Sequence, residues 1–265
     1  MEIKTANVET STTSPPTPLR KRGEKQPSSF RWKVAQWFEL RWWKSYLRGK
    51  NKEEYLAWKK SYWQNILSLV SDKVKLNPSK TIIDLGCGPA GVFIALPQNK
   101  VTAVDPLIDE YENQTPFFSK SNYPNVTFVK STIEEFEVSV IASEALRAKQ
   151  SPSSRVEIAS QSLAMTYDVV FCMNCINHVH DIEKGFEKLK EVCADGGTLV
   201  LSIDAHNFSF FKHLFRLIPG DILHPHQYDL AEYKIFLEKQ GFEIVKTELL
   251  KQEFLFGHWV VVAEK

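Results

Sequence analysis

The stretch TIIDLGCGPAG at residues 81–91 constrains the fold more than any other part of the chain. A short β-branched run ends in Asp84 and is followed by three glycines with the spacing G-x-G-x-x-G. Glycine is needed where a strand turns sharply and a ligand approaches bare backbone. The apolar residues 92–96 predict a short packed helix, stopped by Pro97, whose first amides point at the ligand. The stretch therefore predicts a strand, a ligand-binding turn and a helix.

A second strand of buried type, residues 101–105, ends in Asp105, which lies 21 residues after Asp84. In nucleotide-binding α/β folds this spacing places a carboxylate on a ribose diol. Both features also fit a nicotinamide-dependent oxidoreductase, so the glycine pattern alone leaves the kind of cofactor open.

The string DLGCGP at residues 84–89 resembles the first motif of class I S-adenosylmethionine (SAM)-dependent methyltransferases of the bacterial small-molecule type. The resemblance implies that SAM is the cofactor and that the turn holds its methionine end. It covers about residues 60–265, apart from an insertion described below. The cofactor-binding residues that it implies are Asp84, Gly86, Cys87, Gly88, Gly91, Asp105, Thr132, Ile133 and Asn174.

Thr132 departs from the family pattern, because it stands where the family usually has an Asp on the adenine amino group. Its hydroxyl can still accept a hydrogen bond from the adenine amino group, and the Ile133 amide can donate one to the adenine ring. Asn174 ends a predicted strand at 167–174 that resembles the family's fourth motif and should face the transferred methyl group. The Asn/Asp-Pro-Pro-Tyr string of adenine and cytosine amino-methyltransferases is missing there, which argues against DNA amino groups as the substrate.

The order of these elements predicts an α/β fold with a Rossmann-like, seven-stranded, mostly parallel sheet, an antiparallel C-terminal hairpin and an N-terminal helical cap. The family has such a hairpin, whereas a dinucleotide dehydrogenase is not expected to have one. Asp181 should cap a helix that runs through about Cys193 and is ended by Gly196 and Gly197, and Asp229 with Glu232 should form a capping box. The other strands are predicted at residues 125–129, 198–204, 242–250 and 257–263.

The composition along the chain predicts three parts. Residues 1–29, rich in Ser, Thr and Pro, form a disordered tail, 30–76 a helical cap or lid, and 77–265 the SAM-binding domain. Within the last part, residues 137–166 are a low-complexity insertion without function, because so long a loop is uncommon in a compact domain. The aromatic residues 207–228 form a second insertion at the substrate pocket.

Six of the seven tryptophans lie between residues 30 and 74, on two predicted helices at 31–48 and 52–74 that are broken near Gly49. Residues 20–60 carry 13 Lys and Arg against 4 Glu, a local charge of +9. Such helices either close over the site as a cap or lie in a membrane interface. We favour the cap, because aromatic residues occur nearly all the way round the first helix. Peripheral membrane contact is the alternative.

Four histidines follow the predicted carboxyl ends of strands and are candidate general bases: His178, His206, His224 and His226. A histidine near its ordinary pKa of about 6.5 can accept a proton from a hydroxyl or amine. Cys172, Cys175, His178 and His180 are zinc-ligand types, but Cys172 lies in a buried strand and closure around a metal would require the others to fold back on it. We expect no metal.

The net charge of +1 does not indicate a nucleic-acid-binding protein. The four cysteines suggest free thiols in a reducing compartment. With no signal peptide and no apolar run of about 18 residues, a cytoplasmic location is expected. The predicted activity is SAM-dependent methyl transfer to O or N, less readily C, of a small or lipophilic molecule. The alternatives are a non-catalytic, SAM-binding interaction or membrane-docked module, for which Thr132 is the support, and a NAD-dependent oxidoreductase.

Overall fold

The computed structural model describes residues 29–137, 166–207, 226 and 228–265. The strands are β1 (Ile82–Leu85), β2 (Val101–Val104), β3 (Val126–Val129), β4 (Tyr167–Met173), β5 (Cys193–His206), β6 (Glu243–Gln252) and β7 (Phe256–Glu264). The α-helices are α1 (Ser29–Leu47), α2 (Lys52–Leu69), α3 (Ile108–Gln114), α6 (Ile182–Val192) and α8 (Leu230–Lys239). Short 3₁₀ turns are η1 (Gly88–Ala90), η2 (Val92–Ala95), η3 (Lys120–Asn122) and η5 (Ile176–His178).

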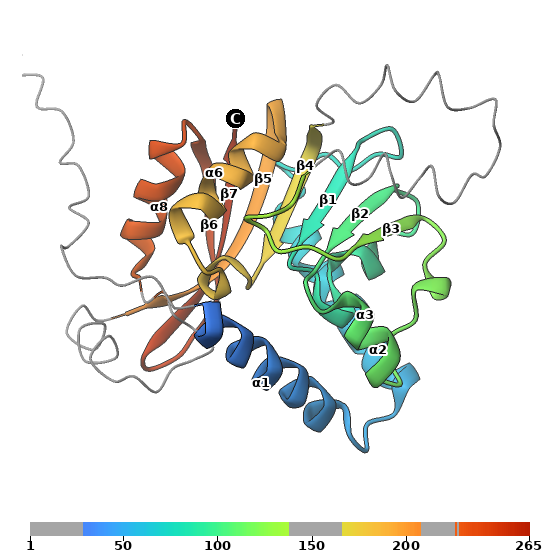
Figure 1. Cartoon of the computed structure of the whole chain (residues 1–265). Helices are drawn as coiled ribbons and strands as arrows, with labels where there is room; N and C mark the ends of the chain where they lie inside the picture. The colour runs from blue at the N-terminus through green and yellow to red at the C-terminus, as the bar shows by residue number, and fades with distance from the viewer. Residues whose placement is uncertain (1–28, 138–165, 208–225, 227) are drawn as a thin grey trace, which may run out of the picture.

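The strands form one sheet in the order β3-β2-β1-β4-β5-β7-β6 (Figure 1). The first five run parallel, and β7 runs antiparallel to its neighbours β5 and β6. The predicted sheet and its antiparallel C-terminal hairpin are therefore confirmed. Because all parallel strands end at the same edge, Asp84, Asp105 and Asn174 are brought to that edge together.

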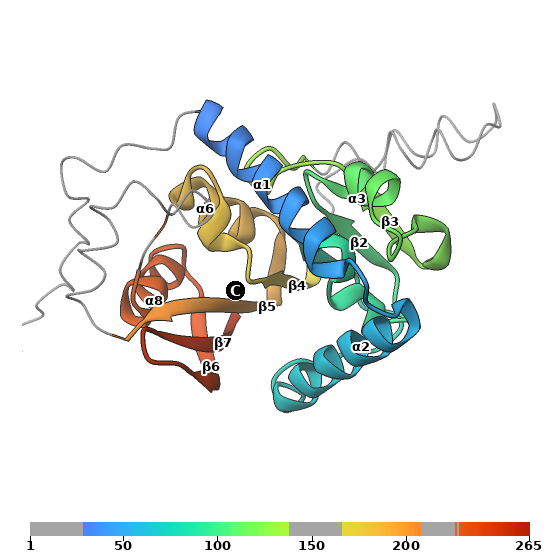
Figure 2. The ribbon, with the colours of Figure 1, turned by 90° about the horizontal axis from the view of Figure 1, so that it is seen from below.

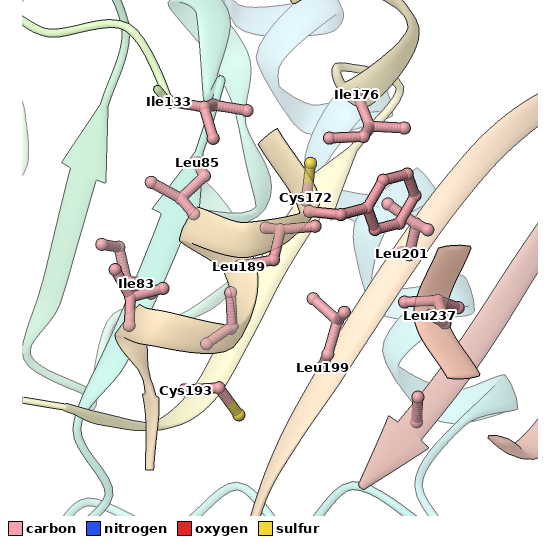
Figure 3. Close-up of a cluster of buried hydrophobic side chains, with 14 of the residues drawn as sticks. Ile83, Leu85, Ile133, Cys172, Ile176, Leu189, Cys193, Leu199, Leu201 and Leu237 are labelled. Carbon is pink, nitrogen blue, oxygen red and sulfur yellow. The ribbon is translucent and has the colours of Figure 1, made fainter. Parts of the chain in front are cut away.

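Helices cover both faces of the sheet, which explains why every residue of β1 and β2 is buried. On one face, Leu189 of α6 and Leu237 of α8 pack on strand residues that include Leu85, Leu199 and Leu201 (Figure 3). The opposite face packs against α2, α3 and η2. The site therefore rests on a sheet that is held from both sides.

The predicted helix caps of the second half are present. Asp181 accepts hydrogen bonds from the amides of Glu183 and Lys184 at the start of α6. Asp229 and Glu232 form a reciprocal capping box at the start of α8. Both caps satisfy backbone amides that would otherwise lack partners at a helix start.

Three predictions about helices differ from the structure. The helix predicted at 52–74 ends at Leu69. The helix predicted to run through about Cys193 ends at Val192, as expected, but Gly196 and Gly197 are not what ends it. The glycines belong instead to β5, where the Gly196 amide donates to the carbonyl of Lys265 at the chain end. Residues 92–96 form the 3₁₀ turn η2 rather than an α-helix.

The first helix crosses the sheet edge at which the parallel strands end (Figures 1 and 2). Gly49 has φ +76 and breaks the chain between α1 and α2, as predicted. The expectation that α1 packs on several sides is wrong, because Trp37 and Trp42 are 55% and 51% exposed. Among the described helices, none is both long enough and apolar enough to cross a bilayer.

The predicted tail, the insertion at 137–166 and most of the insertion at 207–228 lie outside the described residues.

Candidate functional site

The glycine turn after β1 is held by packing as well as by hydrogen bonds. Gly86 has φ +69, and a Cβ there would lie 1.9 Å from the sulfur of Cys175. The amides of Gly86 and Cys87 both donate to the carbonyl of Val104 at the end of β2. The turn can therefore take only glycine at Gly86, and it is tied to the neighbouring strand.

Asp84 lies beneath this turn and is 1% exposed. Its Oδ2 accepts a hydrogen bond from the Phe93 amide at 3.3 Å, and the Val92 amide also bonds the carboxylate. The predicted role of these first amides of the segment after the turn is therefore wrong, because they bind Asp84 rather than point at a ligand. A Cβ at Gly91 would lie 2.4 Å from Oδ2, which explains the third glycine of the pattern.

The second carboxylate oxygen of Asp84 is buried and has no hydrogen-bond partner in the described part of the chain. Burial raises the pKa of Asp84 to about 7, and the bonds from Phe93 and Val92 and the charge of Lys59 oppose that shift. A buried oxygen of this kind is costly unless a donor reaches it.

Lys59 of α2 is the nearby cation. Its ammonium lies over the rings of Trp63, Tyr62 and Trp58, at 4.6, 4.7 and 5.8 Å from the centroids. Burial lowers its pKa to about 8, against the opposing charge of Asp84. Within the described ranges no oxygen acceptor contacts this ammonium, and no direct ion pair joins it to Asp84. Sequence reasoning missed Lys59, because only the fold brings α2 against the glycine turn.

Asp105, at the end of β2, is buried and orders the next turn. Its Oδ2 accepts from the Gly88 amide at 2.9 Å and its Oδ1 from the Leu107 amide at 2.8 Å. Burial, and then the charge of Glu39 on α1, raise the pKa of Asp105 to about 7. A carboxylate has about four acceptor positions, so both oxygens can accept further hydrogen bonds.

A cavity of about 90 Å³ lies between the sheet edge and α1. The predicted residues that line it are Gly86, Asp105, Thr132, Ile133, Asn174 and His178. Trp32, Gln36 and Glu39 of α1 form the opposite wall. The hydroxyl oxygen of Thr132 accepts from the Glu135 amide at 3.1 Å. Asp84, Cys87, Gly88 and Gly91 belong to the turn beside this cavity and do not line it.

The candidate histidines do not converge on one point. His178 lines the cavity. The Nε2 of His226 lies 2.9 Å from the carbonyl oxygen of Val179, the residue after His178. His178 and His226 are therefore on the same side of the site. His206 is buried against the ring of Phe256. His224 lies outside the described residues.

The zinc-type sequence shows no geometry suited to a metal. A hydrogen bond with Cys172, followed by burial, raises the pKa of the Cys175 thiol well above its ordinary value, which disfavours the thiolate that a metal needs. Over residues 29–137, 166–207, 226 and 228–265, no three His, Cys, Asp or Glu side chains gather as metal ligands would.

A further histidine pairs with a carboxylate near the end of β5. The Nδ1 of His258, on β7, lies within hydrogen-bond distance of Asp204 Oδ1. Asp204 is two residues after Ser202, so both side chains lie on one face of the strand. The Ser202 hydroxyl donates to the Asn174 side-chain oxygen at 2.8 Å.

Burial, and then the charge of Asp204, raise the pKa of Tyr62 on α2. The sequence holds Asp204 and His258 in predicted strands, but only the antiparallel register between β5 and β7 makes them neighbours.

The comparisons with known proteins agree with this arrangement. Residues 55–247 match the model of a methyltransferase domain family. The YcgJ protein of Bacillus subtilis aligns with a TM-score of 0.54 at 14% identity, over 76% of this chain and 97% of its own. The magnesium protoporphyrin IX methyltransferase of Synechocystis PCC 6803, solved with bound SAM, aligns with a TM-score of 0.53 at 15% identity, over 89% of this chain and 96% of its own. Both structures share the fold.

Replacing the buried acid should change how stability depends on pH. Because the pKa of Asp84 is raised from 3.8 to about 7, the folded protein binds more protons than the unfolded chain between these values, and it loses stability as the pH rises through about 7. Asp84→Asn removes that loss. The midpoint temperature of unfolding of the variant, relative to that of the wild type, should therefore be higher at about pH 8 than at about pH 5. Calorimetric melts of the ligand-free proteins measure both differences.

Asp195→Asn is the control for this series, because the Asp195 side chain is 98% exposed and should show no such trend. A midpoint difference for Asp84→Asn that is the same at both pH values contradicts the shifted pKa.

Proposed function

The chain belongs to the methyltransferase domain family, on a match that spans residues 55–247, and from this premise we propose that it transfers a methyl group to oxygen or nitrogen of a small or lipophilic molecule. It is a SAM-dependent methyltransferase of class I, with the sheet of that class and its antiparallel hairpin. The family match decides against the nicotinamide-dependent oxidoreductase that the glycine pattern alone left open.

The observation that carries the proposal is the pair of unmatched charges at the glycine turn. One oxygen of Asp84 is buried without a donor, and the ammonium of the half-buried Lys59 lies over aromatic rings without an oxygen acceptor, within the described residues. The methionine end of SAM carries an ammonium and a carboxylate. Bound here, the first would supply the donor that Asp84 lacks and the second the acceptor that Lys59 lacks, so the residues present fit the cofactor.

The cavity residues suit the nucleoside end. Asp105 offers carboxylate positions for ribose hydroxyls, while Thr132 and Ile133 line the same cavity, where an adenine would lie. Pockets that bury a ligand of this size are roughly 300–1,000 Å³. The observed cavity of about 90 Å³ is smaller, and α1 forms one of its walls. We infer that α1 acts as a lid that moves outward to admit the nucleoside.

When bound, SAM supplies an electrophilic methyl group on a sulfonium. The chain then has to hold the acceptor in line, keep water out and take up the acceptor proton. The Asp204–His258 pair does not line the cavity, but it suits proton uptake because Asp204 orients the ring through Nδ1. Nε2 lies 3.6 Å from Glu253 Oε1 and makes no hydrogen bond within the described residues, so it can act as the base. His178, which lines the cavity, is a second candidate.

The proposed activity is tested first by binding and then by turnover. Calorimetry should show binding of SAM and of S-adenosylhomocysteine by the full chain. Extracts supplied with methyl-labelled SAM should then yield labelled molecules in the organic phase. If neither cofactor form binds, the proposal fails. Binding without any labelled product would favour the non-catalytic alternative.

Lys59→Gln should show which of the two charged groups of the cofactor Lys59 binds. Because the variant lacks the ammonium charge that faces the carboxylate, SAM affinity should fall about 10- to 100-fold, the usual effect of losing a charge-assisted hydrogen bond. Affinity for decarboxylated SAM, which keeps the ammonium, should stay unchanged. Asp84→Asn should weaken both ligands. Calorimetric titration of both ligands gives these values.

Lys60→Gln, at the exposed neighbouring lysine, is the matched control and should leave both affinities unchanged. Equal losses for both ligands in Lys59→Gln would remove the carboxylate assignment and leave the methyltransferase assignment intact.

His258→Gln should lower the rate of methyl transfer by roughly 10²- to 10⁴-fold and leave SAM affinity unchanged, because a general base acts in the transfer step and not in cofactor binding. Transfer of labelled methyl to the extract fraction measures the rate, and calorimetry the affinity. His180→Gln, at a half-buried histidine outside both the cavity lining and the Asp204–His258 pair, is the control. An unchanged rate in His258→Gln would exclude this residue as the base and leave His178.

A further inference from the structure

The outer side of α1 and the start of α2 carry large aromatic side chains in an exposed position. Their exposed fractions are 55% for Trp37, 43% for Phe38, 51% for Trp42 and 54% for Trp58. We call this surface the aromatic–basic face; its exposed cations are Lys33, Arg41, Lys44, Arg48 and Lys50.

Helix periodicity separates this face from the inner side of α1. Trp32, Gln36 and Glu39 line the cavity, at the spacing of one helix face. Trp37, Arg41, Lys44 and Arg48 repeat the same spacing about half a turn away, as the exposure of each confirms. One helix therefore serves the cavity with one side and leaves the other to a partner.

Ring contacts that pass through the buried Tyr55 link the aromatic side chains of the two helices. Trp42 stacks on Tyr46 at 4.9 Å between ring centroids, Tyr46 meets Tyr55 at 6.1 Å, and Tyr55 meets Trp58 at 5.9 Å. Arg41 lies over the Trp37 ring at 5.4 Å, and Lys50 lies over the Tyr46 ring at 4.3 Å. The exposed rings and cations are thus held in place by ring contacts beneath the surface.

The charge of this surface is almost entirely positive. Between residues 29 and 52 the sequence has seven Lys and Arg and a single acid, Glu39. Glu39 faces the cavity and accepts a hydrogen bond from the Tyr111 hydroxyl, so it does not offset the outer charge. The acids Glu53 and Glu54 come only at the first turn of α2.

Tryptophan at headgroup depth combined with Lys and Arg is the composition of helices that lie in the interface of an anionic bilayer. The cations complement the surface charge of such a bilayer, and the rings account for the apolar area left uncovered. We propose that the aromatic–basic face docks the enzyme peripherally on an anionic lipid bilayer. The proposal does not depend on the identity of the methyl acceptor.

Docking also brings the bilayer to the lid. The inner side of α1 forms a wall of the cofactor cavity. A bilayer bound to the outer side of α1 would therefore contact the helix that has to move when the nucleoside enters. Lipophilic acceptors dissolved in the bilayer would reach the enzyme at this surface.

The test is cosedimentation of the full chain with phosphatidylcholine vesicles, with or without about 30% phosphatidylglycerol. Binding should require the anionic lipid and weaken as salt is raised. Brominated lipid should quench the tryptophan fluorescence of the bound protein. Trp37→Ser with Trp42→Ser should reduce binding at least about tenfold, and Trp37→Phe with Trp42→Phe should restore part of it.

Arg41→Glu with Arg48→Glu should abolish vesicle binding, whereas Lys184→Glu with Lys190→Glu, the same charge change at exposed positions of α6, should not. Binding of S-adenosylhomocysteine by each variant confirms its folding. Equal binding to neutral vesicles, no binding to anionic ones, or a dimer in solution that the Trp37→Ser and Trp42→Ser changes dissociate would overturn the proposal.

Discussion

The buried carboxylate of Asp84 is the interaction on which the cofactor end of the molecule depends. One oxygen binds the amides that follow the glycine turn, and the carboxylate fills the space that any side chain at Gly91 would need. The other oxygen has no donor among the described residues, and Lys59 stands nearby without an acceptor. The same carboxylate therefore shapes the turn and, in the proposed function, receives the ammonium of the cofactor.

The first helix connects the site with the surface of the molecule. Its inner side closes the cavity through Trp32, Gln36 and Glu39, and the charge of Glu39 contributes to the raised pKa of Asp105. Its outer side exposes Trp37 and Trp42 beside a row of cations. The proposed lid and the proposed docking surface are thus opposite sides of one helix, because residues half a turn apart point in opposite directions.

Local patterns predict much of the architecture. The β-branched runs, the glycine turn, the caps at Asp181 and Asp229 and the terminal hairpin are all decided by residues near one another in sequence, and the structure has each of them. The segment after the glycine turn is a 3₁₀ turn instead of the predicted helix, since the Val92 and Phe93 amides bind Asp84. Local sequence predicts that Gly196 ends a helix. Instead, Gly196 lies in β5 and its amide donates to the carbonyl of Lys265, a partner that local sequence does not reveal.

The sequence by itself determined the fold class, the family resemblance and the residues gathered at the strand ends, because parallel strands bring their carboxyl ends to one edge whatever the details of packing. Only the tertiary structure decided which charges meet there. Lys59 reaches the turn from α2, and His258 reaches Asp204 through the register of β5 with β7. It also decided which tryptophans are exposed. Contacts between residues so far apart in the chain depend on how whole elements pack, and local periodicity carries no information about that packing.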